Sequence, residues 1–203
     1  MKIKIPSSLE TRELMEELDV LPIISEHCEA CAKKALLIAG KILKNGKANR
    51  INLELVELGA KFHDMAKIVT IEELAPEKFG APPATKEQIE RWKKLRKKYG
   101  SDGHELQVLA NIFRKKGFDD LADFLLSIGW TGNQVYLTGS LEVKIIHYAD
   151  WSLQGSKDVN FEDRVDYCID TYRNRWTKKP QIWWNQFKEN ELLLEKEILR
   201  LAE

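Results

Sequence analysis

Apolar residues recur at intervals of three and four positions along the whole chain, which is the spacing of one buried face of an α-helix. Residues that commonly cap helices stand where this pattern breaks, and the sequence has no internal repeat. We therefore expect an all-α protein. Its 203 residues can bury a sizeable core, in one domain or in one domain with an appendage.

The expected helices have recognisable first residues. A short helix is expected before Pro22, and Ser25 is the expected N-cap of a long helix that ends at Lys44. A third helix should cover INLELVELGAKFHDMAK and be capped by Asn49 or Asn52. Other helix starts are indicated by cap residues or capping boxes: Thr70 with Glu73, Thr85 with Gln88, Asp102 with Glu105, Ser140, Asn160 and, in the first turn, Pro180. The glycines expected to end helices are Gly100, Gly117 and Gly129.

The charges of the chain cancel. The 32 Lys and Arg residues equal the 32 Asp and Glu residues in number, which argues against an electrostatically driven grip on nucleic acid or on an anionic membrane. The start, MKIKIPSSLE, has no apolar signal region, and no later stretch approaches the roughly 18 apolar residues of a membrane span. We expect a soluble, cytoplasmic protein whose function resides in a local site.

The three cysteines, Cys28, Cys31 and Cys168, are an odd and sparse set. The Cys28/Cys31 pair has no second pair of ligands to complete a four-ligand zinc site. A redox pair usually lies where a strand meets a helix, whereas HCEACAKKALLIAG indicates the early turns of a long helix. We expect buried or idle thiols.

The stretch LGAKFHDMAKI, residues 58–68, carries a histidine, an aspartate and a lysine within the five positions 63–67 of an apolar helical pattern. His63 and Lys67 are four residues apart and so would share a helix face. One explanation is structural: an ion pair between Asp64 and Lys67 beside a hydrogen-bonded core histidine. The other explanation is a functional site.

His27 and Asp150 favour the functional explanation. His27 lies in the opening turn of its helix and is followed by apolar positions that would bury the same face, so its imidazole should point inward. Asp150 lies in KIIHYADWSL, where a carboxylate is costly to bury without a cationic partner. A divalent metal ion bound by His27, His63, Asp64 and Asp150 would satisfy all of these groups, because neutral imidazoles and carboxylates are its natural ligands.

A histidine on one helix, a His-Asp doublet on the next and a distant aspartate on a later helix form an ordered set of motifs. These motifs, SEHCEACAKKALLIA, HDMAK and IIHYADWSL, resemble the HD-domain superfamily of metal-dependent phosphohydrolases over about residues 22–155. The resemblance implies a helical bundle with a five-helix core at 22–155. We expect a helix before it, at 1–21, and a helical extension after it, at 156–203, packed on the core. The resemblance also implies that the four residues named above bind the metal and that Lys67 contacts substrate phosphate.

Within the superfamily, HDMAK followed by GHELQVLANIF is most similar to small bacterial HD hydrolases that cleave dinucleoside polyphosphates. In those proteins a histidine opens the corresponding helix, and His104 matches it. They carry a further histidine before their final helix, whereas LLSIGWTGNQ contains none, so one metal ion or two stays open. His104 could be a second-metal ligand, a phosphate contact, a proton donor or a surface residue. His147 is expected beside the site or in the core.

The implied function is a metal-dependent phosphohydrolase that cleaves a phosphoester or phosphoanhydride of a nucleotide or dinucleotide with metal-activated water. The ion could be manganese, iron, cobalt, nickel, zinc or magnesium. Lys67 and His104 would offset charge on the leaving oxygen, and Asp64 or Asp150 would orient the water. Two alternatives stay open: an HD-fold module that binds or senses a nucleotide without turnover, and a structural helical domain that assembles through its tryptophan-rich tail.

Other segments each have two explanations. The basic stretch TKEQIERWKKLRKKYG could contact phosphate or be an amphipathic helix with a solvated lysine face. Trp130 and Trp151 could stack on a base or pack in the core. The tail PQIWWNQFKENELLLEKEILRLAE could pack on the core or on a second copy of the chain in a homodimer. EKFGAPPAT and GWTGNQVYLTGS are less regular and could border a cleft.

Overall fold

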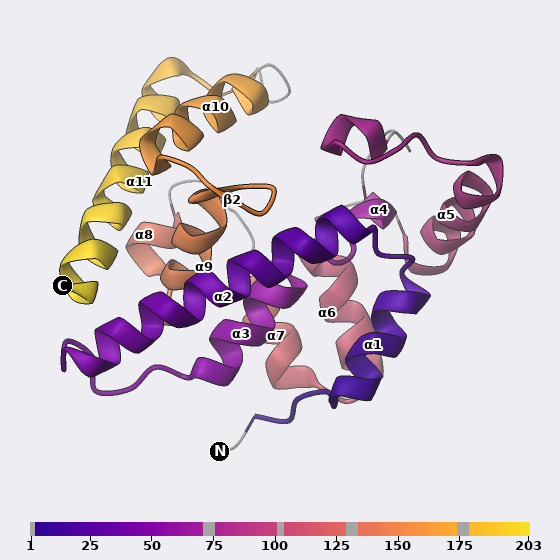
Figure 1. Ribbon diagram of the computed structural model, residues 1–203, viewed down its shortest axis with the longest axis horizontal. Helices are drawn as coiled ribbons and strands as arrows, with labels where there is room; N and C mark the ends of the chain where they lie inside the picture. The colour runs from indigo at the N-terminus through magenta and orange to yellow at the C-terminus, as the bar shows by residue number, and fades with distance from the viewer. Residues whose placement is uncertain (1–2, 71–75, 101–103, 129–133, 174–178) are drawn as a thin grey trace. The chain divides into compact units, whose positions relative to one another are not determined.

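The computed structural model describes residues 3–70, 76–100, 104–128, 134–173 and 179–203 (Figure 1). Within these residues nearly all regular structure is α-helical, which confirms the predicted all-α class. Some of the predicted features lie outside the described residues. They are Glu73, the predicted capping-box partner of Thr70; Asp102, the predicted cap paired with Glu105; the helix end at Gly129; and Trp130.

The α-helices are α1 (Ser8–Glu17), α2 (Pro22–Lys44), α3 (Leu53–Phe62), α4 (Lys67–Thr70), α5 (Lys86–Tyr99), α6 (Glu105–Lys115), α7 (Asp119–Ile128), α8 (Gln134–Thr138), α9 (Leu141–Trp151), α10 (Phe161–Arg173) and α11 (Gln181–Ala202). A short 3-10 helix, η1, covers Pro76–Phe79. The strands β1 (Leu153–Gln154) and β2 (Lys157–Asp158) form an antiparallel hairpin.

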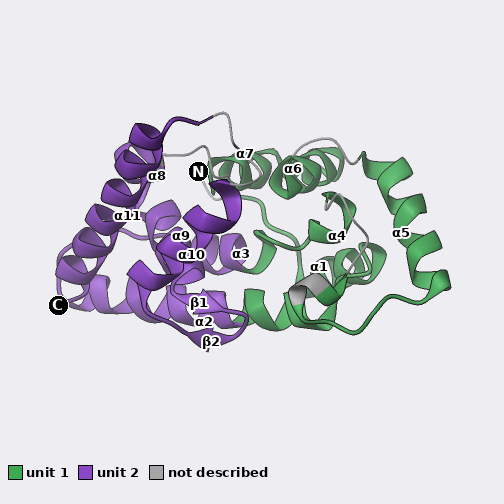
Figure 2. Ribbon diagram, turned by 90° about the horizontal axis from the view of Figure 1, so that it is seen from above, with its two compact units in different colours: residues 1–29, 61–129 green, residues 30–60, 130–203 purple. Residues whose placement is uncertain are grey.

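The chain groups into two compact units (Figure 2). Unit 1 comprises residues 1–29 and 61–129, and unit 2 comprises residues 30–60 and 130–203. Each unit therefore combines two segments that are far apart in the sequence. The predicted domain division, with a helix at 1–21, an HD-type core at 22–155 and a helical extension at 156–203, stays a prediction.

The core of unit 1 is built on α6 and α7, which pack against each other. Their inward faces carry fully buried side chains at four-residue spacing, Leu109 and Phe113 on α6 and Leu121 and Leu125 on α7. The Phe62 ring packs on the Phe113 ring, with 5.0 Å between ring centroids. This contact holds the last residue of α3 in the core of unit 1, directly before His63.

The basic helix α5 is anchored within unit 1 by polar contacts to the end of α1. Trp92 is fully buried, and its indole N–H donates to the Asp19 carboxylate at 2.6 Å. Lys98 and Tyr99 both donate to the Glu17 carboxylate. With one face buried and most of its lysines exposed, α5 is an amphipathic helix with a solvated basic face.

Unit 2 is organised around α9, which contacts α8, α10, α11 and β1. Residues on several sides of α9 are buried: Val143, Ile145, Ile146, His147, Tyr148 and Ala149. The last helix, α11, packs on α8, α9 and α10 through buried residues at three- and four-residue spacing: Trp184, Phe187, Glu191, Leu194 and Ile198. The tail thus packs within unit 2, and a homodimer stays a prediction.

The apolar face of α11 contains one acidic residue, Glu191, which pairs with His147 of α9. The two side chains are buried, and His147 Nε2 lies 2.8 Å from a Glu191 carboxylate oxygen. Burial by itself lowers the pKa of His147, but attraction to the Glu191 carboxylate, the hydrogen bond to it and the charge of Asp150 outweigh burial, so the pKa is raised. The imidazole also stacks on Trp151, with 5.0 Å between ring centroids. His147 is a core histidine with a charged partner.

Several predicted caps are confirmed. Thr85 and Gln88 form the capping box at the start of α5, and Ser140 caps α9. The Asn52 and Asn160 side chains accept backbone N–H groups in the first turns of α3 and α10. The glycines at the ends of α5 and α6 have positive φ angles, 86° at Gly100 and 77° at Gly117.

Three predicted helix boundaries were wrong. The helix α2 begins at Pro22 instead of after Ser25, because a proline needs no N–H partner in the first turn and the Leu21 carbonyl already accepts the Ser25 N–H at 3.0 Å. The helix α3 ends at Phe62 instead of running to Lys67. The helix α6 begins at Glu105, and its N-cap is His104.

The hairpin after α9 was not predicted. Its strands are two residues long, with Leu153 opposite Asp158 and Gln154 opposite Lys157, so they are too short for an alternating apolar pattern. The local signal is Gly155, whose positive φ of 60° suits a tight turn.

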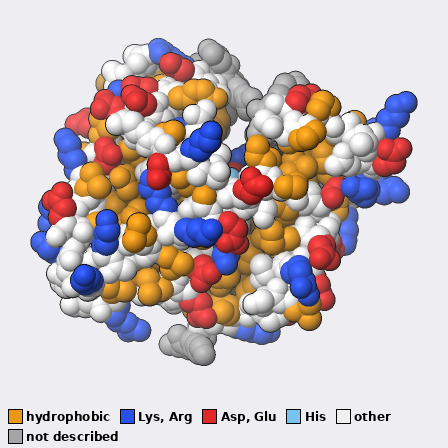
Figure 3. Space-filling model, viewed as in Figure 1, with side chains coloured by type: hydrophobic (Ala, Val, Ile, Leu, Met, Phe, Trp, Pro, Cys, Tyr) orange, Lys and Arg blue, Asp and Glu red, His pale blue; other side chains and the backbone are white. Residues whose placement is uncertain are grey.

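Basic and acidic side chains are interspersed on the face drawn in Figure 3, as expected for a chain with no net charge. Among the helices in the described part of the chain, none is both long enough and apolar enough to cross a membrane.

The His147–Glu191 pair should make the free energy of unfolding depend on pH. Because its pKa is raised, folded His147 holds its proton more tightly than the unfolded chain does. The stabilisation is fully present below the ordinary histidine pKa of about 6.5 and is lost as pH rises through the raised pKa. His147→Gln should be less stable than the wild type by about 3 kcal/mol near pH 5, and the difference should shrink at alkaline pH.

Denaturant unfolding of both proteins over a series of pH values measures this effect. Glu191→Gln is the matched variant, because it removes the charge from the other side of the pair and should flatten the pH dependence in the same way. A difference between wild type and His147→Gln that stays constant with pH would contradict a charged pair.

Candidate metal centre

The end of α3 determines where the candidate site lies. After the buried Phe62 the chain turns tightly: the Met65 N–H donates to the Phe62 carbonyl at 3.0 Å, and the Lys67 N–H donates to the Asp64 carbonyl at 3.0 Å. His63 and Asp64 lie in this turn and not on the helix. Their side chains are therefore released from helical spacing and can converge on one point.

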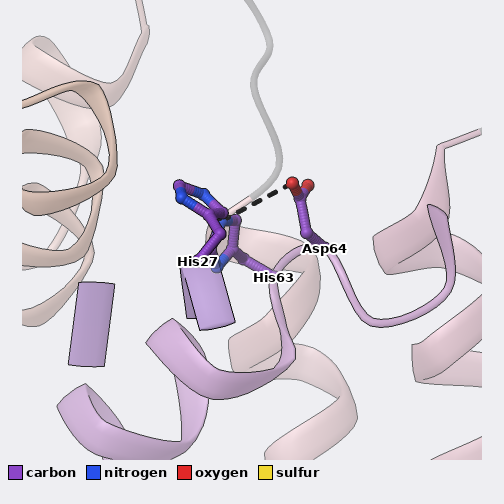
Figure 4. Close-up of side chains that lie close together, drawn as sticks. All are labelled: His27, His63 and Asp64. Atoms are coloured by element: carbon purple, nitrogen blue, oxygen red, sulfur yellow. Dashed lines mark hydrogen bonds and ion pairs between the residues drawn. The ribbon is translucent and has the colours of Figure 1, made fainter. Parts of the chain in front are cut away.

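His27 of α2 completes a cluster with these two residues (Figure 4). Its Nε2 atom lies 3.2 Å from Nε2 of His63, and the two rings meet edge to face at 70° with 5.1 Å between centroids. A carboxylate oxygen of Asp64 lies 3.9 Å from His63 Nε2. One potential ligand atom from each residue lies within 4.8 Å of the others. His63 is buried, whereas His27 and Asp64 are partly exposed.

This cluster could hold a divalent metal ion. Two nitrogen ligands about 2.0–2.1 Å from one ion are about 3.3 Å apart in a tetrahedral site, and the two Nε2 atoms are 3.2 Å apart. Imidazole nitrogens and carboxylate oxygens also suit the first-row divalent ions. In the absence of an ion, the same contact is a hydrogen bond in which one Nε2 carries the proton.

Lys67 is paired with the acidic member of the cluster. Its ammonium group donates a hydrogen bond to the Asp64 carboxylate three residues earlier, which is the ion pair of the structural explanation. An ionised carboxylate has two oxygens and about four acceptor positions, so this bond leaves accepting capacity for a metal ion. The ion pair and a metal site are compatible.

Glu105, in the first turn of α6, interacts electrostatically with Asp64, and sequence analysis missed this. Burial raises the pKa of its carboxyl, and the nearby Asp64 carboxylate raises it further, while His104 and Lys67 oppose the shift. These charges are close enough to affect one another, so Glu105 belongs to the electrostatic surroundings of the cluster. The available signal was its position directly after His104 in GHELQ.

His104 has a structural role that is visible directly. As the N-cap of α6, its Nδ1 atom accepts the Leu106 N–H at 3.3 Å, and the side chain is 46% exposed. The side chain also lies beside Glu105, with 3.7 Å between Nδ1 and a carboxylate oxygen. A further role for His104 as a metal ligand or proton donor stays a prediction.

Asp150, the fourth predicted ligand, lies near the end of α9 in unit 2 and is partly exposed. The cluster of potential ligand atoms consists of His27, His63 and Asp64. The charge of Asp150 contributes to the raised pKa of His147. Its coordination of a metal ion stays a prediction.

The cysteines agree with the expectation of buried thiols. Cys28, Cys31 and Cys168 all lie in the described part of the chain, are buried and form no disulfide bond.

Comparisons with protein-family models, with curated proteins and with solved structures find no match for this chain. The resemblance to HD-domain phosphohydrolases therefore rests on the residues and motifs themselves.

We expect the wild-type protein to bind close to one equivalent of Mn²⁺ or Zn²⁺, and His27→Ala and His63→Ala to lose this binding. Each substitution removes one nitrogen ligand from a set of three. Isothermal titration calorimetry together with metal analysis of the dialysed proteins measures the loss.

His104→Ala is the matched control for metal loading, because it also removes an imidazole from unit 1. It should keep the ion bound by the cluster and lose about 1 kcal/mol of folding stability with the helix cap. Equal metal binding by His63→Ala and the wild type would contradict the assignment of the cluster.

Proposed function

We propose that the protein is a metal-dependent phosphohydrolase of the HD-domain type, acting on a phosphoester or phosphoanhydride of a nucleotide or dinucleotide. The observation that carries the proposal is the convergence of His27, His63 and Asp64 beside a lysine ammonium group. The ordered motifs around His27, the His63-Asp64 doublet and Asp150 support an HD-type helical bundle. The all-α fold agrees with that support at a coarser level.

The cluster supplies the ligands for the chemistry. Two imidazole nitrogens and a carboxylate would hold the ion, with Asp150 proposed as the fourth ligand. When bound, a divalent ion acts as a Lewis acid toward a phosphoryl oxygen and a water molecule. The Asp64 carboxylate also accepts a hydrogen bond from the Lys67 ammonium group, so it would hold that group close to the ion.

Lys67 is the proposed contact for substrate phosphate. The Lys67 side chain is 28% exposed, so a phosphate could reach it while Asp64 holds its ammonium group in place. A fixed positive charge stabilises the negative charge that develops on phosphate oxygens during hydrolysis. Lys67 thus combines substrate binding with charge stabilisation.

Glu105 and His104 are the proposed proton donors at this site. Because burial and Asp64 raise its pKa, Glu105 holds a proton at its carboxyl up to a higher pH than an ordinary glutamate. The His104 side chain is exposed beside it, and an imidazole is a common general acid or base. Either could protonate the leaving oxygen as the bond between that oxygen and phosphorus breaks.

One observation favours a second candidate function, a nucleotide-binding or sensing module without turnover. The segment LLSIGWTGNQ lacks the further histidine of the dinucleoside polyphosphate hydrolases that the chain resembles. A module of this kind would bind the metal ion and a nucleotide but release no phosphate.

Release of phosphate from a panel of mononucleotides and dinucleoside polyphosphates, with added Mn²⁺, tests the proposal. The wild type should hydrolyse at least one class of substrate, and chelation of the metal should stop it. Lys67→Met should lower kcat/KM by about 100- to 1,000-fold because it removes a fixed positive charge from the site.

Lys93→Met is the control for general charge loss, since Lys93 is an exposed lysine of α5 that pairs with Glu90. It should keep wild-type activity. Metal binding and nucleotide binding without any phosphate release would contradict the hydrolase and support the sensing module.

A further inference from the structure

The two ring nitrogens of His63 face different partners. Nε2 lies 3.2 Å from Nε2 of His27, within the candidate metal cluster. Nδ1, on the other side of the ring, lies 4.0 Å from the sulfur of Cys28. Cys28 directly follows His27 on α2 and is only 4% exposed. One turn of α2 therefore places one imidazole against Nε2 of His63 and a thiol against Nδ1.

The tautomer of His63 decides which ring nitrogen can bind a metal ion. A histidine that offers the lone pair of Nε2 must carry its proton on Nδ1. In a buried setting that Nδ1–H group needs an acceptor, because an unsatisfied donor is costly there. Metal-binding histidines usually donate this second N–H to a neighbouring group, which fixes the orientation of the ring.

A thiol suits this position. The sulfur accepts hydrogen bonds weakly and the S–H group donates weakly, so Cys28 can partner the ring in either tautomer. A cysteine also behaves as a small apolar side chain, so its burial costs little compared with that of a carboxylate. The thiol can therefore lie in the core beside His63 without adding a charge to the cluster.

We propose that Cys28 is a positioning residue of the metal centre: its sulfur accepts the Nδ1–H of His63 and so directs the Nε2 lone pair toward the metal ion. This inference rests on the proposed metal-dependent function. It gives a role to a thiol that the cluster itself does not require as a ligand.

The chain offers a matched control in Cys168 of α10. Cys168 is also 4% exposed, but it belongs to unit 2. Substituting alanine for either cysteine removes one buried sulfur atom. Effects that arise from the lost sulfur volume alone should appear in both variants, whereas effects on His63 should appear only in Cys28→Ala.

Two measurements on the 203-residue chain test the proposal. Calorimetric titration with Mn²⁺ or Zn²⁺ should show binding about 10-fold weaker in Cys28→Ala, at the lower end of the effect of removing such a hydrogen-bond partner. Cys28→Ser should recover part of the affinity, because a hydroxyl group can also accept the Nδ1–H. Cys168→Ala should bind as the wild type does.

The second measurement reads the tautomer in the metal-free protein. Long-range nitrogen–proton NMR correlations of His63, assigned by their absence in His63→Ala, should show the proton on Nδ1 in the wild type. In Cys28→Ala, part of the His63 population should move to the Nε2–H tautomer. In Cys168→Ala, the tautomer should be the same as in the wild type. A purely packing role for the thiol would leave the tautomer unaltered.

The outcomes separate this inference from the proposed function. If Cys28→Ala binds metal with wild-type affinity and keeps the wild-type His63 signals, while His63→Ala loses the metal, the role of Cys28 is overturned and the metal centre stands. If the wild type binds no metal ion at all, the proposed function and the role of Cys28 fail together.

Discussion

The packing of Phe62 on Phe113 is the contact on which the candidate site depends. Phe62 is the last residue of α3, and its burial in the core of unit 1 fixes the backbone directly before His63. The turn that follows brings His63 and Asp64 to the same point, where His27 of α2 lies. Loss of this aromatic contact would destabilise the core of unit 1 and displace both site residues together.

The same physical rule governs the polar groups of both units: a polar side chain in an apolar setting needs a partner. In unit 2 His147 and Glu191 satisfy each other and make a stabilising pair within the core. In unit 1 the imidazoles of His27 and His63 present their Nε2 atoms to each other, at a separation that also suits two ligands of one ion. The first arrangement pairs a base with an acid, whereas we propose that the second binds a cation.

Apolar periodicity and cap chemistry predict most helices of the described chain, because each depends on neighbours in the sequence. Thr85 and Ser140 cap their helices as expected. The end of α3 at Phe62 was not predicted, because the apolar spacing of INLELVELGAKFHDMAK is helical throughout. The contact of Phe62 with Phe113 joins residues far apart in the sequence and has no local signal. The grouping of His27 with His63 was predicted, because both residues lie in recognisable motifs. The interaction of Glu105 with Asp64 was missed, because it joins residues far apart in the sequence.

The central claim is that His27, His63 and Asp64 bind one divalent metal ion. Anomalous X-ray scattering from crystals grown with Mn²⁺ tests it most directly, because the signal locates the ion independently of any activity. We expect a single strong peak within about 2.0–2.2 Å of Nε2 of both histidines and of an Asp64 carboxylate oxygen. A well-occupied manganese peak elsewhere, with the two Nε2 atoms still hydrogen-bonded to each other, would contradict the account.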